Sequence, residues 1–315
     1  MTRRLTTACL FLLLAMTPQH ALSQDKTIAP GRKVMISDSS KQTLALIEAD
    51  GKIAWRYKIG PLHDLHVLDN GNILFQKNWT HILEIDLKTD KVVWEYHCKP
   101  TKDGAGKVEA HAFQRLEDGN TMIAESGNAR IIEVNPSGEV VKAIKLQVDQ
   151  PRPHKDTRLV RKTKAGTYLV AHEYHGVCKE YDAKGKVIWE YKVPLFDKEP
   201  TGGNGTKSWG NKLYSVQRLD NGNTLIGTGN GKSVIEVTPE KKIVWHLKPE
   251  NLDGIDFAWI TTVQVLKNGN YVVGNCHAGP ENPQLIEVDR DKNVVWRYTN
   301  WEMFGRATTN SVVYE

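Results

Sequence analysis

Short apolar runs separated by polar turns fill the chain from about residue 33 to its end. One phrase recurs: a turn, then an apolar run that ends in tryptophan. Its copies are Gly51–Trp55, Asp90–Trp94, Gly185–Trp189, Lys241–Trp245 and Asp291–Trp296, and Gly138–Lys142 is a sixth copy with lysine in the tryptophan position. No stretch has sustained helical periodicity. The pattern therefore predicts an all-β chain built from repeats.

A second phrase, with Asn-Gly or Asp-Gly at its centre, lies between the tryptophan copies. It occurs at Leu68–Asn72, Leu116–Asn120, Leu219–Asn223 and Leu266–Asn270, with a degenerate copy at Lys164–Thr167. The turn glycines fall 48, 47, 56 and 47 residues apart. Such a pair between two apolar runs predicts a hairpin in which both turn residues take positive φ.

Each repeat is long enough for four strands, which is the size of a propeller blade. In the second repeat we expect strands at 65–68, 73–76, 82–86 and 91–96. The first repeat has only three, at 33–37, 43–48 and 53–59, and a lone strand at 307–314 ends the chain. This last strand is expected to complete the first blade and close the ring. The fold class predicted is a six-bladed β-propeller of four-stranded blades.

The N-terminus has the pattern of a secretory signal. Arg3 and Arg4 precede an apolar run at 10–16, and Ala21-Leu22-Ser23 supplies small residues for cleavage. The run is too short to span a bilayer. We therefore expect a signal peptide at 1–23, a single propeller domain at 24–315, and a periplasmic or secreted protein without a membrane span.

Charge and cysteine content exclude two classes of protein. The formal charge of +5 falls to +3 when the segment 1–23, with two arginines and no acids, is removed. This charge is too small and too dispersed to predict nucleic-acid binding. The three remaining cysteines, Cys98, Cys178 and Cys276, are an odd number, so they are not a disulfide framework.

The segment Ile85–Trp94 resembles the tryptophan-docking repeat of the quinoprotein, or PQQ-like, propellers. The resemblance extends over nearly all of the chain after residue 23. The PQQ dehydrogenases of that superfamily are generally larger and eight-bladed, with an adjacent cysteine pair near the quinone. This chain has no such pair, so we expect the architecture without PQQ and without another organic cofactor.

His63-Asp64 before one turn phrase, and His111 before the next, are similar to the histidine-containing blade phrases of bacterial arylsulfotransferases. The resemblance implies an exported six-bladed propeller in which a histidine near the channel mouth accepts a sulfuryl group. It carries over to His63 and His111 only, because this chain has no evident extra N-terminal β domain.

Blade topology places the loops on two faces. Turns between strands one and two, and three and four, are short and form what we call the short-turn face. The other connections are longer and form the long-loop face, which collects most of the histidines. His63 and His111 each stand eight residues before a turn glycine, so they should occupy matching places near the axis, and His154 enters similarly. With Arg158 or a second histidine to neutralise an oxyanion, these histidines and Arg158 are the candidate catalytic residues.

Other polar and aromatic residues of the long-loop face are candidates for binding. Tryptophans outside the repeat, near a pocket, stack on sugars or aromatic ligands. The candidate ligand-binding residues are Asp64, Trp79, Glu125, Asn128, Glu173, Trp209, Trp259, Asn275, His277 and Asn310. His172 and His175 are candidate ligands of a divalent metal, and His111 and His154 with Glu125 or Glu173 could complete the ligand set, although the spacing matches no known metal motif.

Three functions stay open from the sequence. The first is binding of a small polar, sugar-like or aromatic ligand at the channel mouth. The second is an enzyme at the same place, catalysing sulfuryl transfer or metal-assisted lyase or hydrolase chemistry. The third is a scaffold for protein partners, which rests only on what propellers often do.

Overall fold

The computed structural model describes residues 31–315, and the expected signal segment lies outside them. Within these residues the strands form six four-stranded antiparallel sheets, as predicted. Blade one contains β24 (Thr308–Val313), β1 (Val34–Asp38), β2 (Thr43–Ile47) and β3 (Ile53–Lys58); blade two β4 (Leu65–Val67), β5 (Ile73–Asn78), β6 (His81–Asp86) and β7 (Lys91–His97); and blade three β8 (Glu109–Arg115), β9 (Thr121–Ser126), β10 (Arg130–Val134) and β11 (Val140–Lys145).

The second half of the ring repeats this arrangement. Blade four contains β12 (Val160–Lys162), β13 (Tyr168–His172), β14 (Val177–Tyr181) and β15 (Val187–Lys192); blade five β16 (Ser215–Arg218), β17 (Thr224–Gly227), β18 (Val234–Val237) and β19 (Ile243–Leu247); and blade six β20 (Trp259–Val265), β21 (Tyr271–Cys276), β22 (Leu285–Val288) and β23 (Val294–Tyr298). A single 3-10 turn, Pro249–Asn251, is the one helical element described, so no described helix has the length to cross a bilayer.

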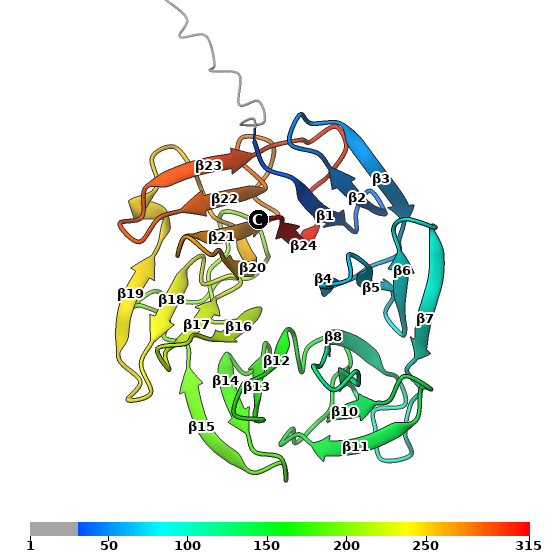
Figure 1. Cartoon of the computed structure of the whole chain (residues 1–315). Coiled ribbons are helices and arrows are strands. Elements are labelled where there is room, and N and C mark those ends of the chain that lie inside the picture. The colour runs from blue at the N-terminus through cyan, green and yellow to red at the C-terminus, as the bar shows by residue number, and fades with distance from the viewer. Residues whose placement is uncertain (1–30) are drawn as a thin grey trace, which may run out of the picture.

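The last strand closes the ring, as expected from its isolated position in the sequence. β24 pairs with β1, and the register runs from Val34 opposite Val313 to Asp38 opposite Thr308. In Figure 1 the red C-terminal strand lies beside the blue first strand at the axis. The first blade is thus built from both ends of the described chain.

The turn chemistry differs from our prediction. Gly71 has a φ of 85°, but Asn70 is not among the described residues with positive φ. Gly71 N–H donates to Leu68 O at 2.8 Å, and Leu68 N–H donates to Asn72 O at 2.9 Å. The loop therefore holds three residues, as in a type I turn followed by a left-handed glycine bulge. The expectation of two positive-φ residues was wrong because it assumed a two-residue loop.

The repeat tryptophans join neighbouring blades. The indole of Trp55 donates to Asp90 at 2.9 Å, that of Trp189 to Pro239 O at 2.9 Å, and that of Trp245 to Arg290 O at 2.8 Å. Each acceptor lies in the turn between strands three and four of a different blade from its tryptophan. The packing role predicted for these tryptophans is confirmed.

A glutamate on the third strand of five blades, buried in all of them except Glu180, forms a second inter-blade contact. Each glutamate pairs with a cation of the following blade at 2.7 Å or less. The pairs are Glu84–Arg115, Glu133–Lys162, Glu180–Arg218, Glu236–Arg290 and Glu287–Arg32. A charge pair with a buried carboxylate is costly to break, so these residues fix blades two to six each against the following blade.

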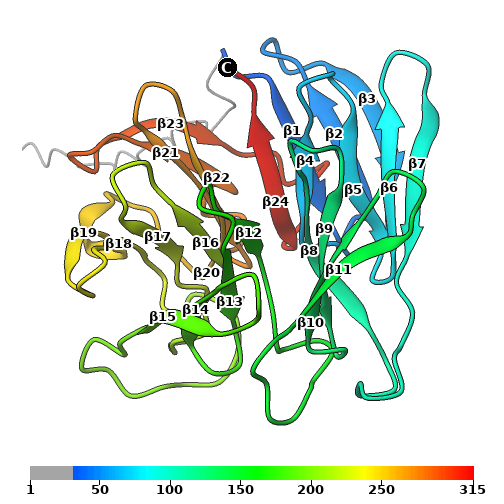
Figure 2. The ribbon, with the colours of Figure 1, turned by 60° about the horizontal axis from the view of Figure 1, so that its bottom comes forward.

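The two faces differ as the loop lengths indicate. Figure 2 shows the long connections β7–β8, β11–β12 and β15–β16 together on the lower side of the ring.

Between the innermost strands, toward the short-turn face, lies a cavity of about 200 Å³ whose lining includes His66, Arg161 and Gln264. Cys98, Cys178 and Cys276 are buried and unpaired.

Candidate functional site

Five side chains meet at the axial end of the long-loop face, and we call them the mouth cluster: His63, Trp79, Glu109, His111 and His154. They come from blades two and three and from the loop that leads into blade four. His63 lies two residues before β4, Trp79 lies in the β5–β6 turn, Glu109 and His111 are on β8, and His154 lies in the β11–β12 loop. The structure thus brings together the three histidines that the sequence singled out as candidate catalytic residues.

A β-bulge directs His111 into the cluster. Ala110 pairs with Glu125 and Ala112 pairs with Ala124, so His111 is the extra residue of β8. A bulge of this kind re-aims a side chain at the end of a strand, and such bulges are common beside functional sites. The ring centroid of His111 lies 4.5 Å from that of His63, and their Nδ1 atoms are in contact.

Glu109 links two of the imidazoles. Its Oε2 lies 2.9 Å from Nε2 of His111 and 2.8 Å from Nδ1 of His154. Because a carboxylate only accepts, both of these nitrogens carry the proton. His111 Nδ1 is then an acceptor for the N–H of His63, and His154 keeps Nε2 for solvent or a ligand. The side chain of His154 is 52% exposed, so this nitrogen is accessible.

Burial sets the charge states. Desolvation, together with the nearby Arg158 guanidinium, lowers the pKa of His111 to about 3. Desolvation, again with Arg158, also holds the pKa of His63 well below its usual range. Burial alone would raise the pKa of Glu109, but hydrogen bonds from His111 and His154 lower it to about 2. At neutral pH the cluster therefore contains two neutral buried imidazoles and an ionised carboxylate.

Trp79 forms the aromatic wall of the cluster. Its ring lies 4.7 Å from that of His63, 5.1 Å from that of His111 and 5.2 Å from that of His154, measured between centroids. The side chain is part-exposed. An apolar ring surface thus borders the exposed imidazole of His154.

Arg158 lies beside the cluster but is already paired. It forms a buried ion pair with Glu173, and its Nη1 donates to Thr157 O at 3.1 Å. Its Nη1 is 3.5 Å from Nδ1 of His111. The guanidinium therefore supplies no unpaired positive charge for a bound anion.

A second ion pair, between Asp64 and Arg161, lies next to the cluster. Asp64 is buried and accepts from Arg161 at 2.7 and 2.9 Å and from the backbone N–H of Phe113 at 3.0 Å. Asn310 donates to Asp64 at 3.2 Å and to the carbonyl of His63 at 3.1 Å. Asn310 thus holds the backbone of His63 and is itself bonded to Asp64, and Asn310 also lines the cavity described above.

The other predicted binding residues lie in local loop networks. Glu125 accepts from Asn128 at 2.9 Å, and Asn128 also holds the segment around Lys99 and Thr101. Asn275 holds the segment 256–258 through Ala258 N–H and Asp256 O. These contacts satisfy the polar groups of long loops.

The aromatic and metal candidates are likewise dispersed. The indole of Trp209 donates to Leu195 O, and the ring is covered by Lys198. Trp259 lies beside Lys212 and Gly229, and the backbone N–H of His277 donates to Arg306 O. His172 Nε2 contacts Tyr181 OH at 2.9 Å. His172 and His175 do not belong to either of the two metal-type groups found among residues 31–315.

One of those two groups lies in the mouth cluster itself. The ligand atoms of Glu109, His111 and His154 all fall within 4.8 Å of one another. Sequence reasoning placed Glu109 on the long-loop face without giving it a role, and it did not select Arg161 or Tyr214, whose hydroxyl donates to His63 O at 3.3 Å. Nothing local marks them, because the bulge at His111 and the contacts across the axis arise only on folding.

The amino-acid sequence of this chain matches a known protein family. Residues 40–298 match the family described as outer membrane protein assembly factor BamB, a PQQ-like repeat family. The chain belongs to this family. The expected PQQ-like resemblance is therefore confirmed, whereas no curated protein matches the sequence.

Solved structures of other proteins share the propeller fold of this chain. A protein of unknown function from Bacteroides caccae is 22% identical, with a TM-score of 0.73, and covers 90% of this chain and 99% of its own. Streptogramin B lyase is 14% identical, with a TM-score of 0.57 and coverage of 88% and 84%.

A catalytically inactive histidine-to-alanine variant of virginiamycin B lyase from Staphylococcus aureus, solved with quinupristin, is 12% identical. Its TM-score is 0.56, and the coverage is 89% of this chain and 88% of that one. At these identities the three likenesses show the propeller fold alone.

Proposed function

We propose that this chain is an exported propeller that binds a small, ring-containing polar ligand at the mouth cluster. The observation that carries the proposal is the exposed His154 imidazole, which Glu109 orients at 2.8 Å beside the ring of Trp79. A hydrogen-bonding nitrogen next to an aromatic wall suits a sugar-like or aromatic ring that carries hydroxyl groups.

The charge of the cluster favours ligands that donate hydrogen bonds. Arg158 is paired with Glu173 and Arg161 with Asp64, so neither cation is available. Glu109 contacts only imidazoles, of which His111 is neutral at pH 7. A carboxylate without a cation disfavours a bound sulfate. We therefore do not propose sulfuryl transfer, for which Arg158 was to stabilise the oxyanion.

Metal-assisted chemistry is a second candidate, because two imidazoles and a carboxylate within 4.8 Å are a common ligand set for a divalent metal. Lyases are among the propellers with the same fold, and one of them is inactivated by loss of a histidine. An assembly role rests on the family description, and no contact among residues 31–315 favours it.

Isothermal titration with three probes tests the proposal. 4-Nitrophenyl β-D-glucoside contains a sugar ring and an aromatic ring. 4-Nitrophenyl sulfate carries the sulfate group that the cluster disfavours, and Mn²⁺ tests the metal alternative. We expect the glucoside to bind and the sulfate not to bind. His154→Ala and Trp79→Ala should each weaken glucoside binding at least about tenfold, since each removes a central contact.

Trp209→Ala is the matched control, because Trp209 is a loop tryptophan of the same face with partners of its own. Its affinity should equal that of the wild type. Absence of glucoside binding at millimolar concentration, or equal binding by the His154 and Trp209 variants, would remove the ligand site from the mouth cluster. Mn²⁺ binding that is lost in Glu109→Gln would favour the metal candidate instead.

A further inference from the structure

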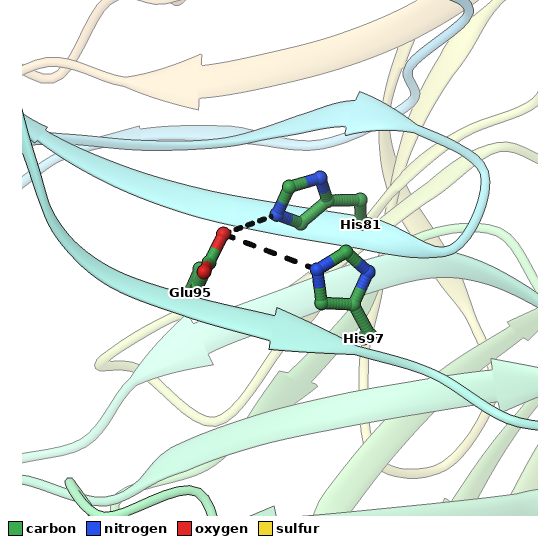
Figure 3. Close-up of side chains that lie close together, drawn as sticks. All are labelled: His81, Glu95 and His97. Carbon is green, nitrogen blue, oxygen red and sulfur yellow. Dashed lines mark hydrogen bonds and ion pairs between the residues drawn. The ribbon is translucent and has the colours of Figure 1, made fainter.

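A second group of metal-type side chains lies at the outer edge of blade two. It consists of His81 at the start of β6 and of Glu95 and His97 at the end of β7, the outermost strand of that blade. Figure 3 shows both imidazoles directed toward the carboxylate of Glu95. Nε2 of His81 lies 2.8 Å from Glu95 Oε2, and Nε2 of His97 lies 3.9 Å from the same oxygen.

The hairpin register brings the two histidines together. His81 is opposite His97 in the β6–β7 ladder, and the adjacent Cys98 N–H donates to Thr80 O at 2.8 Å. Hydrogen-bonded and non-hydrogen-bonded pairs alternate along an antiparallel ladder, so His81 and His97 form a pair of the second, closer kind. Their ring centroids are 3.8 Å apart. Glu95, two residues before His97, projects from the same side of β7.

The backbone at this end of the hairpin is fixed by a side-chain turn. Asn78 Oδ1 accepts from the backbone N–H of Thr80 and from that of His81, both at 3.0 Å. This arrangement holds the start of β6 in place against the end of β5. The imidazole of His81 is therefore presented from a rigid strand end, and little order has to be created when a ligand binds.

The distances suit a transition-metal ion. The three ligand atoms lie within 4.8 Å of one another. A zinc ion binds imidazole nitrogen at about 2.0–2.1 Å, so two ligands of one ion are at most about 4.2 Å apart. Small rotations of the exposed side chains close the difference. Glu95 and His97 are 55% and 56% exposed, which leaves these rotations unhindered and leaves room for water ligands.

The chemistry of the donors selects the kind of ion. Imidazoles suit Zn²⁺, Cu²⁺ and Ni²⁺, whereas Ca²⁺ and Mg²⁺ require more oxygen ligands than this site offers. Lys77 is the nearby cation, and the carboxylate of Glu95 opposes its charge.

We propose that His81, Glu95 and His97 form a binding site for a divalent transition-metal ion of the zinc type, which bridges the outer two strands of blade two. Three protein ligands and exposed open positions are the arrangement of a site that keeps one or more waters on the metal. The site shares no residue with the mouth cluster, so it does not depend on the proposed function.

The proposal is tested by titrating the purified, chelator-treated protein with ZnCl₂ by isothermal calorimetry. To separate the two groups, the titration is also made in Glu109→Gln, which disrupts the ligand set of the mouth cluster. We expect zinc to bind in both proteins. His97→Ala should weaken the affinity at least about tenfold in either background, because loss of even an outer-shell partner costs 10–100-fold.

His246→Ala is the matched control, because His246 is another outer-strand histidine but stacks on Phe196 and belongs to neither metal-type group. It should bind zinc as the wild type does. Circular dichroism establishes that each variant is folded. Unchanged affinity when His97→Ala is added to Glu109→Gln in a folded protein, or loss of all zinc binding in Glu109→Gln alone, would overturn the proposal.

Electron paramagnetic resonance with one equivalent of Cu²⁺ provides a readout that does not depend on affinity. In Glu109→Gln we expect coupling of the copper electron to two imidazole nitrogens. The further change His81→Asn or His97→Ala should leave coupling to one nitrogen. A spectrum that either change leaves unaltered would place the copper elsewhere and would also overturn the proposal.

Discussion

At the scale of single residues, burial decides what the histidines of this chain can do. His63 and His111 are held neutral by desolvation, and desolvation also lowers the pKa of His172 to about 3. His154 differs because its side chain is half exposed. One imidazole of the mouth cluster is therefore accessible to a ligand, and the two behind it are part of its support.

These buried imidazoles predict acid sensitivity. In the unfolded chain a histidine takes up a proton near pH 6.5, whereas in the folded protein His172 does so only near pH 3. Protons therefore favour the unfolded state, and stability present above pH 6.5 is lost as the pH falls toward 3. For each such histidine the free energy of unfolding should fall by about 1.4 kcal/mol between pH 7.5 and 5.5.

Urea unfolding at the two pH values measures this loss. His172→Phe should reduce it by the share of one histidine. An equal pH dependence in wild type and His172→Phe would show that His172 is not held neutral in the folded protein.

At the scale of elements, the repeat phrases predict every blade because both signals are local. Alternation defines the strands, and the turn glycine defines where they reverse. The strands expected at 43–48 and 91–96 are observed at 43–47 and 91–97. The contacts that join blades are not local. The partner of Glu84 is Arg115, 31 residues away, and only the assembled ring brings the two together.

This pair is predicted to stabilise the junction of blades two and three. Glu84 accepts from Arg115 at 2.6 Å and from Asn72 at 2.7 Å, and its side chain is 9% exposed. Glu84→Leu leaves both donors without the carboxylate, which should cost about 2–4 kcal/mol of unfolding free energy. Blade one already has Leu46 at the matching position, opposite Trp55, so leucine itself fits.

Adding Arg115→Leu to Glu84→Leu should recover part of this loss, because no unpaired charge remains. Chemical denaturation of the single and double variants measures the coupling. Asp220→Asn, which breaks the exposed Lys164–Asp220 pair, should produce no measurable change. If Glu84→Leu were as stable as the wild type, the buried pairs would not contribute to blade packing.

At the scale of the molecule, the ring determines which residues meet. The mouth cluster draws on blades two and three and on the loop that leads into blade four, and Asn310 of the closing strand holds the backbone of His63. The sequence placed His63 and His111 at equivalent blade positions, which was sufficient to propose their proximity. It did not show that Glu109 connects His111 and His154, because no turn residue in the sequence marks the bulge at His111.

Closure by β24 therefore supports both the fold and the cluster, and its removal is the sharpest test of the architecture. Deleting residues 307–315 exposes the edge of β1 and removes the contact of Asn310 with His63. We therefore expect the truncated chain to lose cooperative unfolding and to aggregate through the free edge.

A circular permutant keeps the strand but moves the ends. It begins at Gly203, in an exposed loop, and a short linker joins residue 315 to residue 31, since Tyr314 N–H donates to Lys33 O at 2.9 Å. The permutant should unfold cooperatively near the wild-type urea midpoint. If the truncated chain did so as well, ring closure would not be what holds the blades together.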